Sequence, residues 1–112
     1  SAAPARLSLF AVAPRVLIDN AASAGHTVIE VNGRDRRGLL YRLTRTLSDL
    51  KLQISSAKIS TFGERAVDVF YVKDRFGLKI EDEPRLKTIR ETLLPVLADD
   101  TVAPARSSVA AE

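Results

Sequence analysis

Within residues 31–43, VNGRDRRGLLYRL, the segment 33–38 places three arginines, one aspartate and two glycines between two apolar stretches. A turn of this composition could be an active site, a phosphate cradle, a small-molecule pocket or a capped helix start. The first turn of a helix offers unpaired N–H groups and a partial positive charge, which attract a carboxylate or a phosphate. Gly38 has no side chain, so a ligand could approach the backbone there.

Asp35 has two readings in this turn. It lies three residues before Gly38, so its carboxylate could accept a hydrogen bond from a free N–H at the helix start, which stabilises a helix by about 1 kcal/mol. Alternatively, the carboxylate of a free amino acid could rest on the amides of Gly38, Leu39 and Leu40 while Asp35 binds the ammonium group. The residue types favour capping and leave amino-acid binding open.

Other chemistries find less support in the sequence. The segment GRDRRGLL has the two glycines of a P-loop, but Leu39 and Leu40 stand where Lys-Ser/Thr is required. His26, the one histidine, falls in an expected loop, and no serine or threonine has an evident base to activate it. Cysteine is absent, which excludes disulfides and thiolate metal ligands. We therefore expect no catalytic residue, no metal site and no cofactor in this chain.

The composition is that of a soluble globular domain. Its 17 basic and 14 acidic residues are interspersed and give a net charge of +3, unlike the basic stripe of a nucleic-acid-binding protein. No apolar run approaches the roughly 18–20 residues of a membrane span. A chain without cysteine is compatible with the cytoplasm. Methionine is also absent, and the first three residues, SAA, resemble a scar of tag cleavage, so we expect a piece excised from a longer protein.

The elements that must position the turn follow from hydrophobic periodicity. Alternating patterns predict strands over residues 15–20, 27–32, 53–61 and 66–74. A stripe of leucines at spacings of three and four predicts a helix over about 38–50. A second stripe predicts a helix after Asp82, which could cap it with Pro84 in its first turn. The second stripe consists of Leu86, Ile89, Leu93 and Leu97.

The element order indicates an α+β, ferredoxin-like two-layer sandwich. The last five elements form a β-α-β-β-α series, which lacks the final strand of the split β-α-β unit. We predict that the strand over residues 15–20 replaces that C-terminal strand. The result is a four-stranded antiparallel sheet with two helices on one face. The domain would span residues 15–98, between a flexible segment 1–14 and a disordered tail 99–112.

The uncovered face of this sheet allows a test of RNA binding, because RNA-recognition domains share the strand order. Those domains stack bases on exposed aromatic residues. Here Phe70 and Tyr71 fall on opposite faces, and the first core strand has no aromatic residue. RNA binding is therefore a weak alternative. A mixed face containing Val28, Glu30 and Lys58, like an unpaired edge strand, often contacts a second copy of the chain.

Residues 27–74 resemble an ACT domain, and most of residues 15–97 is similar to the C-terminal ACT domain of the bifunctional uridylyltransferase/uridylyl-removing enzymes. The resemblance is carried by TVIEVNGRDRRGLLYRLTRTLSDL, by QISSAKISTFGERAVDVFYVKD and by the PRLKTIRETL helix. The family pattern at the turn is Asp-Arg-Pro-Gly, whereas this chain has Arg37 in place of the proline. Proline would fix the backbone at the helix start, so the substitution makes this turn less rigid.

The resemblance implies a regulatory module that binds L-glutamine, often at an interface with a neighbouring ACT domain or in a homodimer. The parent enzyme would add UMP to, or remove it from, the PII nitrogen-signalling protein. Its catalysis, with Mg and UTP, belongs to domains outside this chain. The alternative is a structural ACT module that binds no ligand. By position, the pocket would use Asn32, Asp35, Gly38, Leu39 and Leu40, and a second domain would close it with the strand that corresponds to Ser55, Ser56, Ala57, Lys58 and Ile59.

Overall fold

The structure is a computed structural model that describes residues 12–98. Residues 1–11 of the expected N-terminal segment and the whole expected tail, residues 99–112, lie outside the described residues. The elements are β1 Arg15–Asp19, β2 Thr27–Arg34, α2 Leu39–Asp49, β3 Gln53–Phe62, β4 Arg65–Lys73 and α3 Glu83–Ala98.

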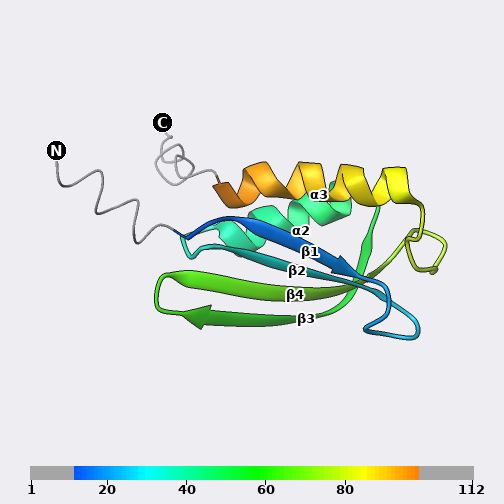
Figure 1. The fold of residues 1–112 in the computed structure, drawn as a ribbon, viewed down its shortest axis with the longest axis horizontal. Helices are drawn as coiled ribbons and strands as arrows, with labels where there is room; N and C mark the ends of the chain where they lie inside the picture. The colour runs from blue at the N-terminus through cyan, green and yellow to red at the C-terminus, as the bar shows by residue number, and fades with distance from the viewer. Residues whose placement is uncertain (1–11, 99–112) are drawn as a thin grey trace, which may run out of the picture.

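The four strands form one antiparallel sheet in the order β1-β2-β4-β3. Strand β1 lies beside β2, where the split β-α-β arrangement would place its last strand, so the predicted replacement is confirmed. Figure 1 shows α2 and α3 together on one face of this sheet. The α+β, ferredoxin-like sandwich expected from the sequence is therefore the observed fold.

Strand β2 is longer than predicted. Gly33 still pairs with Ala66, and Arg34 pairs with Arg65, so the strand runs two residues beyond Asn32. The partner strand β4 begins at this level, directly after the hairpin turn between β3 and β4. Its backbone groups there can still form hydrogen bonds with β2. The hairpin itself turns at Gly63, whose φ of 62° is favourable only for a residue without a side chain.

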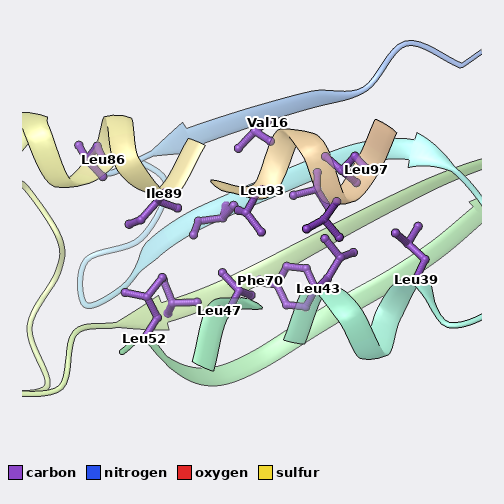
Figure 2. Packing of buried hydrophobic residues seen from close by; sticks show 14 of the residues in the cluster. Val16, Leu39, Leu43, Leu47, Leu52, Phe70, Leu86, Ile89, Leu93 and Leu97 are labelled. Atoms are coloured by element: carbon purple, nitrogen blue, oxygen red, sulfur yellow. The ribbon is translucent and has the colours of Figure 1, made fainter. Parts of the chain in front are cut away.

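Helix α3 buries the whole stripe that the sequence predicted, whereas α2 buries only part of its own, because Leu40 is 42% exposed. Leu39, Leu43 and Leu47 of α2 are buried, and so is the predicted stripe of α3. Figure 2 shows Leu43 beside the ring of Phe70 from β4, with the α3 leucines over the β1 side of the sheet. Asp82 caps α3 as predicted, because its Oδ2 accepts the amide of Arg85 at 2.9 Å.

The uncovered face of the sheet is mixed, as expected. The register places Val28 opposite Tyr71 and Glu30 opposite Val69 on this face, and the adjacent edge adds Ser56 and Lys58. Tyr71 is the only aromatic side chain that the two central strands present here, since Phe70 points into the core. This face therefore lacks the row of aromatic residues on which RNA bases stack. Over residues 12–98, neither helix is both long and apolar enough to cross a membrane.

Candidate functional site

The turn between β2 and α2 is tied to its surroundings by backbone hydrogen bonds. The amide of Asp35 donates to the carbonyl of Glu64 at 2.7 Å, which fastens the turn to the β3–β4 hairpin. The amide of Leu39 donates to the carbonyl of Arg36 at 3.2 Å, and that of Arg42 donates to Gly38 at 3.0 Å. The backbone around the helix start is thus positioned by the protein before any ligand arrives.

No side chain of residues 12–98 caps α2, so the capping reading of Asp35 is wrong. The N-cap residue is Gly38, with a left-handed φ of 81° and no side-chain hydrogen bond at the helix start. Within residues 12–98, the amides of Gly38, Leu40 and Tyr41 take part in no hydrogen bond. These amides and the helix dipole leave a site of partial positive charge that no side chain among the described residues caps.

Three of the predicted pocket residues gather at this helix start. Asp35 and Gly38 are exposed, and the side chain of Leu40 is 42% exposed. Leu39 is different, because its side chain is 3% exposed in the core and its amide is already bonded to Arg36. An exposed carboxylate and free amides therefore lie within one turn of chain, and Leu39 anchors that turn to the core.

The structure does not bring the side chain of Asn32 to this turn. Asn32 lies on the uncovered face of the sheet, opposite Val67, where its Nδ2 donates to Oε2 of Glu30 at 3.0 Å. The helices cover the other face. The alternation of β2 explains this, because Ile29 and Val31 face the helices and the next residue must point away.

The three arginines of the turn do not converge, which argues against a phosphate cradle. Arg34 pairs with Arg65 across the strands and lies on the uncovered face. Arg36 turns towards α3, where Nη1 donates to the carbonyl of Leu97 at 3.2 Å and Nη2 donates to that of Val96. Arg37 is exposed. Arg36 thus binds backbone carbonyl groups at the C-terminus of α3. Its positive charge also lies at the negative end of the helix dipole.

Asp68 is a buried acid that was not predicted from the sequence. Its side chain is 2% exposed, on the helix-facing side of β4, in register with Val31 and Ile59. The amide of Ser60 donates to its Oδ1 at 3.4 Å. Burial, and to a smaller extent the nearby charge of Asp35, raises the pKa of Asp68 above its ordinary value. The signal was present in the sequence, because alternation places Asp68 on the same face as Ala66 and Phe70.

Strand β3 forms an exposed edge of the sheet. Ser55, Ser56, Ala57 and Lys58 are exposed, and Ile59 is 48% exposed although it lies on the helix-facing side. A ten-residue edge with free backbone groups is a natural place for another strand to pair. The segment assigned to domain contact is therefore accessible in this chain.

His26 offers no catalytic arrangement. Its ring packs edge-on against Tyr71, with centroids 6.2 Å apart, and the residue is half-buried. In the part of the chain that the structure describes, no three His, Asp or Glu side chains are grouped to hold a metal ion.

Comparison with known proteins agrees with this fold. Residues 15–111 match a family described as the ACR9-like, ACT-like domain. A bifunctional uridylyltransferase/uridylyl-removing enzyme of Azospirillum brasilense is 70% identical over 94 residues, which are 84% of this chain and 10% of that protein. Proteins of the same name from Rhodospirillum rubrum and Gluconobacter oxydans are 59% and 60% identical, over 80% and 87% of this chain and 10% of each relative. This chain spans about a tenth of the length of these relatives.

Proposed function

The chain belongs to the ACT-like domain family, and from this premise we propose that it is a glutamine-sensing regulatory domain of a bifunctional uridylyltransferase/uridylyl-removing enzyme. In this proposal the chain itself performs no catalysis. Addition and removal of UMP on PII, with Mg and UTP, belong to other domains of a longer cytoplasmic protein. Identity of 70% to one such enzyme over most of this chain supports the assignment of the parent protein.

The observation that carries the proposal is the uncapped start of α2 beside an exposed carboxylate. The free amides of Gly38, Leu40 and Tyr41 suit the α-carboxylate of an amino acid. Asp35 suits its ammonium group, since a charge-assisted hydrogen bond is about twice as strong as a neutral one. Leu39 supports this site through its buried side chain, and the side chain of Asn32 bonds to Glu30 on the uncovered face of the sheet.

A neighbouring ACT domain or a second copy would complete the site along β3. The exposed segment from Ser55 to Ile59 is the accessible edge of the sheet. A ligand held between two sheets binds well only when the two are docked, so it shifts the equilibrium towards the docked arrangement. Effectors of this kind typically couple to a distant site by about 1–3 kcal/mol, which is enough to change the balance between two opposed activities.

Isothermal titration calorimetry on the chain would test the proposal with glutamine, glutamate and other amino acids. We expect saturable heat with glutamine, abolished in Asp35→Ala and retained in Arg37→Ala, which removes an exposed charge two residues away. Because Asp35 caps nothing, the Asp35→Ala protein should keep its thermal stability. Absence of heat with every amino acid at millimolar concentration would refute ligand binding by this chain.

The long exposed edge also favours a second candidate, a structural ACT module that pairs with another domain and binds no ligand. It predicts self-association through β3 that is independent of amino acids. Sedimentation with and without glutamine separates the two functions, because only a sensing domain should change its association when glutamine is added.

A further inference from the structure

A cavity of about 490 Å³, open to solvent, lies at the end of the sheet where β2 begins. It is lined by residues 24–25 of the β1–β2 connection, by Lys73 at the end of β4, and by residues 77–79 and 81 of the β4–α3 connection. Figure 1 shows these two connections at the same end of the sheet, away from the β3–β4 hairpin. The volume falls within the range of about 300–1,000 Å³ that is typical of small-molecule sites.

This cavity is separate from the turn before α2. That turn follows the last residue of β2, whereas the cavity lies beside the first. A strand of eight residues that rises about 3.3 Å per residue places the two roughly 23 Å apart. A ligand in the cavity therefore shares no residue with the candidate amino-acid site.

The walls of the cavity are held in place by hydrogen bonds of the protein itself. Oδ1 of Asp74 accepts the amide of Leu78 at 2.9 Å within the β4–α3 connection. The fully buried Thr27 accepts the amide of Ile80 on its Oγ1 at 2.8 Å. Asn20 donates from Nδ2 to the carbonyl of Ile80 at 2.7 Å, which ties the same connection to the end of β1. A ligand would thus meet a surface that is already ordered, and its binding would cost little conformational entropy.

Two lysines at this cavity have unused hydrogen-bond donors. Both Lys73 and Lys79 are half-buried. Nζ of Lys79 donates to the carbonyl of Asn20 at 2.6 Å, which uses one of its three donors. Lys73 forms no hydrogen bond or ion pair within residues 12–98, and the exposed Glu81 pairs with neither lysine. The lysines are therefore not neutralised by contact with an acid of the described residues.

We propose that this cavity is a binding site for a small organic anion, independent of the function proposed above. The carboxylate or phosphate group of the ligand accepts charge-assisted hydrogen bonds from Lys73 and Lys79. The apolar part of the ligand covers Leu78, whose side chain is 63% exposed at the cavity. Gly25 and Gly77 leave the backbone open, because a Cβ added to either would meet no atom within 4 Å.

NMR of the isotope-labelled chain would test the site with three probes, acetate, hexanoate and inorganic phosphate, at constant ionic strength. We expect saturable shifts of the amide signals of residues 24–25 and 77–79, and no comparable shifts at residues 38–41. Hexanoate should bind more tightly than acetate, because its tail can cover Leu78. Tightest binding of hexanoate identifies a carboxylate ligand, and tightest binding of phosphate identifies a phosphorylated one.

Variants at the charged residues give the result its meaning. Lys73→Gln, which keeps the length of the side chain and removes its charge, should weaken binding by about fivefold or more. Lys79→Gln should act in the same direction, while its amide can still donate to the carbonyl of Asn20. Glu81→Gln removes a negative charge beside the anion and should strengthen binding by about twofold. Lys51→Gln, at an exposed lysine after α2, is the matched control and should change binding by less than about twofold.

The outcomes that would overturn the site are specific. Equal weakening in Lys73→Gln and Lys51→Gln would show only a general attraction of anions to a basic chain. Absence of saturable shifts with all three anions at millimolar concentration would also overturn the proposal, and equal binding of acetate and hexanoate would contradict the apolar contact. Circular dichroism checks the fold, and Lys79→Gln provides the decisive comparison if Lys73→Gln is disturbed. Because the amide signals report the two sites separately, failure here leaves the sensing function standing.

Discussion

Arg36 donates a hydrogen bond from Nη1 to the carbonyl oxygen of Leu97 at 3.2 Å, across 61 positions of the sequence. Its Nη2 reaches the carbonyl of Val96 as well. The residue next to Asp35 therefore holds the last turn of α3. The candidate ligand site and the end of the second helix are joined by one side chain, so a change in the turn has a direct route to α3.

Removing this connection should destabilise the domain. Arg36→Ala deletes two charge-assisted hydrogen bonds to helix-end carbonyls, each worth about 1.5–3 kcal/mol in favourable cases. We expect a loss of about 2 kcal/mol in the free energy of unfolding, measured by urea denaturation. Arg37→Ala is the control, because this neighbouring arginine is exposed and its removal should change stability by less than about 0.5 kcal/mol. Equal effects of the two variants would contradict the capping role of Arg36.

Replacing Gly38 should strain the start of α2. Its φ of 81° is left-handed, and an alanine there costs about 1–2 kcal/mol. No atom lies within 4 Å of an added Cβ, so the cost would come from the backbone alone. Gly25→Ala is the control: it also meets open space, without a left-handed φ, and should be neutral or slightly stabilising. Thermal melts of the two variants would show whether backbone conformation alone distinguishes these positions.

Gly33 is required by close packing. A Cβ at this position would lie 3.0 Å from Leu97 Cδ2 and 3.3 Å from Leu97 Cβ, so Leu97 would have to shift by a few tenths of an ångström. We expect Gly33→Ala to cost about 1–3 kcal/mol by overpacking. A double-mutant cycle with Leu97→Ala checks the cause, since the second change removes the clashing atoms. The double variant should be less destabilised than the sum of the single ones, and simple additivity would argue against this contact.

Asp68 should make stability depend on pH in the acidic range. Its pKa is raised above the ordinary 3.8, so between 3.8 and the raised value the folded chain keeps a proton that the unfolded chain has lost. The protonated form of Asp68 therefore makes its full contribution to the free energy of unfolding below pH 3.8. This contribution is lost as the pH rises through the raised pKa of the folded chain. Asp68→Asn should remove this contribution and stabilise the domain near neutral pH relative to the unaltered chain.

Urea titrations across the acidic range would measure that effect. Asp49→Asn, at an exposed position on α2, should leave the pH dependence as it is. If Asp68→Asn follows the same pH profile as the unaltered chain, the buried carboxyl is not the group that titrates.

Much of the fold could be predicted because its signals are local. The leucine spacing of α2, the capping of α3 by Asp82 and the alternation of the strands each reflect residues a few positions apart. The short loop after β1 also fixed the place of that strand, since a hairpin partner must lie adjacent and antiparallel. The side of the sheet on which Asn32 and Asp68 lie followed from the same alternation, although the sequence analysis did not draw that conclusion for either residue.

The sequence by itself therefore determined the elements, their pairing and the presence of an exposed acid beside a helix start. Only the tertiary structure decided that Asp35 leaves the α2 amides free, that the guanidinium of Arg36 binds the end of α3, and that the buried Asp68 accepts the amide of Ser60 from β3. The physical reason is the separation along the sequence over which each interaction acts. Periodicity and capping act over a few residues, whereas a hydrogen bond between residues 36 and 97 exists only after the whole core has packed.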